Sequence, residues 1–181
     1  MWAMVVAASS LALSPHVRAT DPVIAAVLAT SLDESAVVQK FVGVIEGSNL
    51  LVYLSRGDCP RPATACLMMA GGGPEVRYVR INFTLPSGLG RARAWFRDEL
   101  SISIAHELQH AAEIAEWPEV TDGPSLQAAY LNRGLSCRRC PLDTGAAIEA
   151  GEARRLELRH GSRPVPSNRS GAARDARRGG R

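Results

Sequence analysis

The chain is organised around residues 102–114, which read Ile102-Ser103-Ile104-Ala105-His106-Glu107-Leu108-Gln109-His110-Ala111-Ala112-Glu113-Ile114. Apolar and polar residues recur at helical spacing, so we expect one amphipathic helix. Residues four apart lie on the same face of a helix, and His106 and His110 can therefore direct both imidazoles to one point. The pattern His-Glu-x-x-His predicts a metal site, for which zinc is the typical ion.

The acid beside the first histidine has a different predicted role. Glu107 lies about 100° around the helix from His106, so it does not reach the metal as a ligand. Zinc lowers the pKa of a bound water from ~15.7 to ~7, and Glu107 is placed to take the proton. Glu107 is therefore the predicted general base. The alternative is a surface helix that matches a short pattern by chance; the clean separation of an apolar face around Ile104 and Leu108 favours the site.

The wider string from Ile104 to Glu116 resembles the zincin superfamily of metallopeptidases. It is also similar to a group of small bacterial proteins that carry a His-Glu-Leu-Gln-His-Ala helix after a run like that from Val76 to Ile81. The similarity covers residues 32–158 and is strongest at the motif. It implies a zincin-like α+β domain, with a small mixed or antiparallel sheet and a long active-site helix packed on it. It further implies a zinc-dependent hydrolase of the gluzincin type, without supplying a substrate.

The third zinc ligand has to come from another part of the chain, because catalytic zinc usually has three protein ligands and an open position. No histidine follows His110 closely, so a carboxylate of a later helix is expected, from Asp143, Glu149 or Glu152. In the bacterial group this helix often opens with a Glu-Thr pair followed by alanines. Asp143-Thr144 matches that place, and the resemblance therefore favours Asp143, with Glu149 in reserve. The alternative role of Asp143 is a helix N-cap.

Further residues are candidates for supporting roles. Glu113 lies on the metal face one turn beyond His110, where a carboxylate can orient a ligating imidazole through its other nitrogen. No residue is assigned to stabilise an oxyanion; Tyr130 and the arginines after Gly90 are candidates.

Composition limits the range of functions. The chain has 181 residues, 46% of them hydrophobic, which suits one domain. The net charge of +3 is small and much of the basic excess lies in the C-terminal tail, so no nucleic-acid partner is predicted. No apolar run reaches the roughly 18 residues of a membrane span. The expected partner is a peptide or protein substrate.

The N-terminus suggests export. Residues 1–13 are apolar and rich in small residues, and Val17-Arg18-Ala19 resembles a cleavage site before Thr20. We therefore expect a signal peptide over residues 1–19 and a secreted or periplasmic protein. A basic segment at the start is missing, and the protein is cytoplasmic if this segment is not a signal.

Four cysteines fit an oxidising compartment. They form two local pairs, Cys59 with Cys66 and Cys137 with Cys140, and we expect a disulfide within each pair. The connectivity stays open, as do a redox role for the second pair and a structural zinc site made from all four cysteines.

The remaining helices and strands are predicted from hydrophobic periodicity and from residues that typically start or end such elements. Ser31 and Glu34 form a predicted capping box that starts a helix ending at Gly47. The last predicted strand alternates strictly and is expected to be an edge strand beside the metal helix. We predict strands over 49–55, 65–70 and 76–85; a metal helix starting within 91–97 and ending at Pro118; helices over 124–133 and 143–158; a catalytic domain over 20–158; and a disordered basic tail over 159–181.

These patterns together predict a zinc metallopeptidase. The alternatives are a non-catalytic or degenerate zinc-binding exported protein, and a disulfide-stabilised secreted binding module with an accidental motif. The substrate and the oligomeric state are left open by the sequence.

Overall fold

The computed structural model describes residues 14–60, 62–86, 94–134 and 143–161. Within these residues five helices accompany one four-stranded mixed sheet, which agrees with the predicted α+β class. In chain order the elements are β1 (Val17–Ala19), α1 (Pro22–Glu34), α2 (Ala36–Glu46), β2 (Leu50–Arg56), β3 (Ala65–Gly72), β4 (Arg77–Phe83), α3 (Ala94–Ala115), α4 (Gly123–Asn132) and α5 (Gly145–His160).

The sheet has the strand order β1-β2-β4-β3. β1, β2 and β4 are mutually parallel, and β3 runs antiparallel to β4 along one edge. The predicted alternation of β4 is confirmed, since Val79 and Ile81 are buried while Tyr78 and Arg80 are exposed. The prediction that this strand forms an edge was wrong, because β3 folds back beside it and takes that position. Alternation reports which faces of a strand are covered and carries no information on its neighbours.

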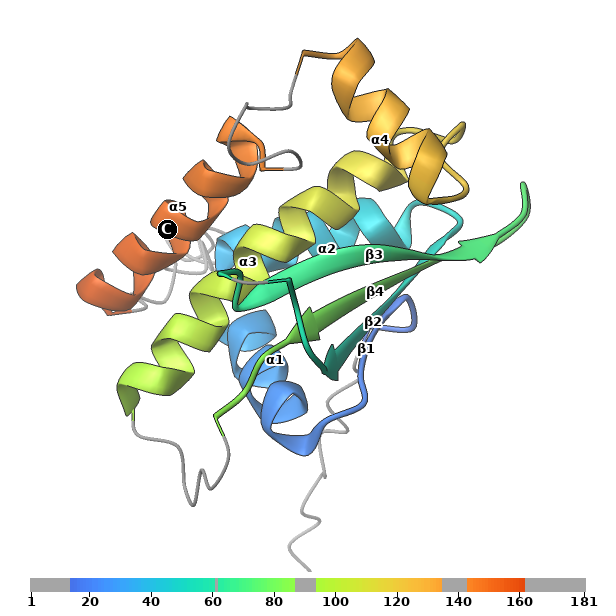
Figure 1. Ribbon diagram of the computed structural model, residues 1–181. Helices are drawn as coiled ribbons and strands as arrows, with labels where there is room; N and C mark the ends of the chain where they lie inside the picture. The colour runs from blue at the N-terminus through green and yellow to red at the C-terminus, as the bar shows by residue number, and fades with distance from the viewer. Residues whose placement is uncertain (1–13, 61, 87–93, 135–142, 162–181) are drawn as a thin grey trace, which may run out of the picture.

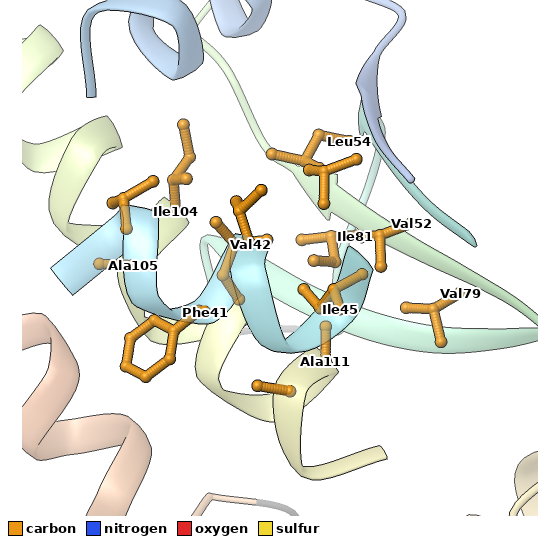
Figure 2. Packing of buried hydrophobic residues seen from close by; sticks show 14 of the residues in the cluster. Phe41, Val42, Ile45, Val52, Leu54, Val79, Ile81, Ile104, Ala105 and Ala111 are labelled. Atoms are coloured by element: carbon orange, nitrogen blue, oxygen red, sulfur yellow. The ribbon is translucent and has the colours of Figure 1, made fainter. Parts of the chain in front are cut away.

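The helices α1, α2 and α3 cover one face of the sheet, and α5 packs against α3 on the side away from the strands (Figure 1). The core lies between these layers. In Figure 2 the α2 residues Val42 and Ile45 point toward Val52 and Ile81 of the sheet, with Ile104 of α3 beside them. Burying each such aliphatic side chain stabilises the fold by about 1.5–3 kcal/mol. This packing holds α3 firmly by its apolar face, so its polar face is presented in a defined direction.

The first two helices differ from the prediction. Asp21 caps α1 by accepting hydrogen bonds from the amides of Val23 and Ile24, with Pro22 at the first helical position. Ser31 lies inside α1 and does not start a helix; the N-cap of α2 is Ser35. The capping-box prediction was wrong because the apolar run before Ser31 is itself helical.

Arg77, the first residue of β4, is buried and joins the sheet to the end of α3. Its Nε donates to Oδ1 of Asn49 at 2.8 Å. Its two terminal nitrogens donate to backbone carbonyls at and just beyond the C-terminus of α3, where the helix ladder ends. These carbonyls belong to Ile114, Ala115, Trp117 and Val120, at 2.7–3.2 Å.

The predicted disulfide between Cys59 and Cys66 is present. It closes the connection from β2 to β3, and such bonds persist in oxidising compartments. The second predicted pair, Cys137 with Cys140, lies outside the described residues.

Regular structure lies on both sides of residues 20–158, the range predicted for the catalytic domain. Val17 of β1 is fully buried, and the amide of Val52 donates to the carbonyl of His16. A cleavage after Ala19 would therefore remove a strand of this sheet; the signal peptide stays a prediction. At the other end α5 continues to His160 and is capped by Gly161, and residues 162–181 of the predicted tail lie outside the described residues.

No single helix among the described residues is long and apolar enough to cross a membrane. Only α1 and α2 taken together, bent by 102°, have the required length and composition, and both bury one face in the core.

Candidate metal centre

The two motif histidines and Asp143 come together at one point. The rings of His106 and His110 lie 5.0 Å apart, one turn from each other on α3. Oδ1 of Asp143 is 3.3 Å from Nε2 of His106 and 3.8 Å from Nε2 of His110. Glu149 and Glu152, the other predicted candidates, are exposed on α5 and lie outside this group.

Thr144 determines where Asp143 lies. The Thr144 hydroxyl accepts a hydrogen bond from the amide of Ala147 at 3.1 Å and so caps α5. The alternative role of Asp143 as the cap is therefore taken by its neighbour. The same hydroxyl donates to Oε1 of Glu113 on α3 at 2.8 Å. Asp143 is thus held at the junction of the two helices with its carboxylate directed at the histidines.

His110 is oriented through its other ring nitrogen, as predicted for Glu113. Nδ1 of His110 lies 3.2 Å from Oε2 of Glu113 and 3.1 Å from the hydroxyl of Tyr130. The Tyr130 hydroxyl itself donates to Oε2 of Glu113 at 3.1 Å. With the Nδ1 proton donated to the carboxylate, Nε2 keeps its lone pair facing Asp143.

His106 is the more accessible of the two histidines, with 26% of its side chain exposed against 7% for His110. Burial and the neighbouring His110 lower the pKa of His106, while Asp143 and a hydrogen bond with the backbone of Ala147 oppose this. The lower pKa favours the neutral imidazole, which is the form that binds metals.

The two buried acids of α3 have pKa values shifted in opposite directions. Burial raises the pKa of Glu107 to about 7; Asp143 adds to this and His110 opposes it. Burial also acts on Glu113, but hydrogen bonds from His110 and Thr144 outweigh it and lower the pKa of that carboxyl. Such a divergence assigns different tasks to two neighbouring carboxylates. Glu113 stays ionised as a hydrogen-bond acceptor, and Glu107 is able to exchange a proton near neutral pH.

The donor set fits a bound cation. Oδ1 of Asp143 is buried, yet it accepts no hydrogen bond from the described residues. It faces two imidazole nitrogens, and without a proton or a cation between them these lone pairs repel one another. The ligand atoms of the three residues lie within 4.8 Å of one another, and this group could hold a metal ion. Two histidines and one carboxylate are the ligand set of a common class of catalytic zinc site.

Tyr130 does not have the position that a candidate oxyanion stabiliser needs. Its ring is buried, and its hydroxyl is engaged by Glu113 and His110. Burial and the charge of Glu113 raise the pKa of Tyr130 above its ordinary value. Tyr130 is buried on the same side of α4 as Leu126, and the sequence held no signal for its polar partners. Of the other candidates, Arg91 and Arg93 lie outside the described residues.

Comparison of the chain with models of protein families, with curated proteins and with solved structures found no match. The resemblance to zincins therefore rests on the motif.

Proposed function

We propose that this protein is a zinc-dependent hydrolase, and more narrowly a gluzincin-like metallopeptidase. The observation that carries the proposal is the convergence of His106, His110 and Asp143, next to the buried acid Glu107. Each of two zinc ligands lies ~2.0–2.2 Å from the ion, so two ligand atoms at a tetrahedral angle are about 3.4 Å apart. The distances of 3.3 and 3.8 Å from Asp143 to the two imidazoles agree with this spacing.

The roles of the residues follow from their positions. His106, His110 and Asp143 would hold the ion, which when bound lowers the pKa of a water and polarises a carbonyl. Glu107 takes a proton from the attacking water and delivers it to the leaving nitrogen. Glu113 holds the His110 ring in the tautomer that ligates.

The edge strand β3 supports a peptide as the substrate. Within the described residues β3 pairs only with β4, and it lies against α3. An extended chain can add to such an edge through main-chain hydrogen bonds. The sequence analysis predicted that β4 would be the edge strand beside the metal helix. In the structure β3 is the edge strand. The substrate is therefore proposed to be a peptide or a protein segment in extended form.

We further propose that the protein works outside the cytoplasm, as a secreted or periplasmic protein. The Cys59–Cys66 disulfide supports an oxidising compartment.

The second candidate function is a non-catalytic zinc-binding exported protein. One observation favours it: the hydroxyl of Tyr130, the candidate oxyanion donor, is already engaged by Glu113 and His110. Such a protein would bind zinc at the same three residues and cleave no peptide.

The test combines metal analysis with a mixture of synthetic peptides. The full chain is purified without added zinc and analysed for bound metals, and the peptides are followed by mass spectrometry. Wild type should carry about one zinc and cleave. Glu107→Gln should keep the zinc and lose cleavage by roughly 100-fold or more. The matched control is Glu116→Gln, the same change at an exposed position just past α3, which should leave both unchanged.

Each other outcome has a defined meaning. Absence of zinc from wild type would refute the zinc site. Zinc with no cleavage of any peptide would favour the non-catalytic alternative. Cleavage by Glu107→Gln at the wild-type rate would show that Glu107 is not the general base.

A further inference from the structure

The outer face of the sheet carries a row of basic and aromatic side chains. Neighbouring strands align Arg18 with Tyr53, Tyr53 with Arg80 and Arg80 with Met68. These four residues lie on the face opposite to the buried valines 17, 52 and 79, and the helices α1, α2 and α3 cover that other face (Figure 1). Arg18, Arg80 and Met68 are exposed, and Tyr53 is half-buried.

A hollow of about 350 Å³ lies on this face, at the ends of β2 and β4. Two arginines, Arg56 and Arg80, contribute to its wall, and no acidic side chain of the described residues lines it. Its lining consists of Thr20, Tyr53, Ser55, Arg56, Gly57, Arg80 and Asn82.

The two guanidinium groups differ in whether they already form an ion pair with a carboxylate. Nε of Arg56 donates to Oδ2 of Asp21 at 2.9 Å, and its other nitrogens form no ion pair with a carboxylate of the described residues. Arg80 has no carboxylate within ion-pair distance in the described part of the chain. The hollow therefore has two positive charges and one neighbouring carboxylate, that of Asp21, among the described residues.

We propose that this hollow binds a small ligand through a phosphate monoester group. A phosphate monoester carries a charge of about −1.5 to −2 near pH 7 and offers several acceptor oxygens. Two guanidinium groups provide the matching charge and donors. The hydroxyls of Ser55 and Thr20 already donate to Oδ1 of Asn82 and to the carbonyl of Leu54, so the arginines carry the binding. The volume corresponds to the smaller ligand sites of proteins, about 300 Å³ and above. The half-buried ring of Tyr53 forms an apolar surface for the rest of the ligand.

This site is separate from the candidate metal centre and does not depend on the proposed hydrolase activity. None of its lining residues belongs to the network around His110. Binding of phosphate at the metal centre would be a different result, and the experiment distinguishes the two.

The test is calorimetric titration of the full chain with inorganic phosphate and, separately, with succinate, at constant ionic strength and pH 7.5. Phosphate should bind saturably at millimolar concentration or below. Arg80→Gln should weaken it about tenfold or more, since one charge-assisted pair is lost. Arg80→Lys keeps the charge without the planar fork and should lie between the two. The control Arg97→Gln alters an exposed arginine of α3 and should leave binding unchanged.

Four results would overturn the proposal. One is the absence of saturable phosphate binding, and another is equal binding by wild type and Arg80→Gln. Equal or tighter binding of succinate would assign the hollow to carboxylates instead. Loss of phosphate binding from wild type treated with a chelator, or from His110→Ala, would place the phosphate at the metal centre.

Discussion

The hydroxyl of Thr144 donates a hydrogen bond of 2.8 Å to Oε1 of Glu113, and this contact joins the two helices that form the candidate metal centre. Oε2 of the same carboxylate lies 3.2 Å from Nδ1 of His110. Glu113 therefore holds a histidine of α3 with one oxygen and the start of α5, next to Asp143, with the other. One buried carboxylate fixes both sides of the site.

We expect Glu113→Gln to weaken zinc binding roughly 10- to 100-fold, the usual effect of removing a partner behind a metal ligand. The amide has the shape of the carboxylate but loses its charge and one acceptor oxygen. Thr144→Val removes the contact from the other side and should also reduce the affinity. The measurement is competition with a chelating dye, with Glu116→Gln as the control. Wild-type affinity in both variants would show that the network does not position the ligands.

Tyr130→Phe separates two possible roles of the tyrosine. The phenylalanine keeps the packing against Trp117 and removes the hydroxyl that contacts Glu113 and His110. If the tyrosine positions the ligands, zinc affinity should fall while kcat of the zinc-loaded enzyme stays within a few-fold of wild type. If it acts on the substrate, kcat should fall by roughly 100-fold with affinity unchanged. The structure favours the first outcome.

Asp143→Ala tests the third ligand. We expect a loss of zinc affinity of about 100-fold or more, because only two histidines would remain. Glu149→Ala is the matched control, since this acid is exposed on the same helix and should be silent. Equilibrium dialysis of both variants gives the comparison. An affinity loss in Glu149→Ala but not in Asp143→Ala would transfer the ligand role to the reserve candidate.

Arg77→Met should lower the free energy of unfolding by about 3 kcal/mol. The change leaves backbone carbonyls at the end of α3 without the donors that Arg77 provides. Arg80→Met is the matched control, because Arg80 is exposed on the same strand and should change stability by less than about 0.5 kcal/mol. Urea denaturation measures both. Equal stabilities of the two variants would contradict a supporting role of Arg77 for α3.

Asp21 predicts a pH dependence of stability. Burial alone would raise its pKa, but hydrogen bonds from Arg56 and from the amides of Ile24 and Val23 outweigh it, so the pKa lies below its ordinary value of 3.8. The ionised group therefore stabilises the fold fully above about pH 4, and this stabilisation is lost as the pH falls through the folded-state pKa.

Asp21→Asn keeps an N-cap acceptor and removes the charge. We expect it to be less stable than wild type at pH 7, with a difference that shrinks below about pH 4. Asp33→Asn, at an exposed position of α1, is the control. Thermal unfolding across this pH range measures the difference, and a constant difference would refute the interpretation.

Local patterns predicted the parts of the site that lie within one helix. The four-residue spacing of His106 and His110 sets their common face, and the position of Glu113 on that face indicated its contact with an imidazole. The choice of Asp143 came from resemblance, and the structure brings this residue to the histidines. Tyr130 was only a candidate oxyanion stabiliser, and its contacts with Glu113 and His110 were not predicted, because contacts between α3 and α4 depend on how the helices dock.

The errors in the fold have the same origin. Ser31 matched a capping pattern, but a helix start depends on what precedes it, and Asp21-Pro22 had already started α1. β4 was taken for an edge because its alternation does not reveal that β3 returns beside it. β1 has only three residues and pairs with a strand more than thirty positions away, so no local signal marks it.

The distribution of the candidate ligands along the chain also affects when an ion can be captured. His106 and His110 share one helical turn, whereas Asp143 arrives with a separate segment that becomes a neighbour only after α5 has docked on α3. A nascent or unfolded chain offers just a loose two-imidazole chelate. Tight binding of the ion would therefore occur only in molecules in which α5 has docked on α3. Partially folded chains would not bind the ion tightly.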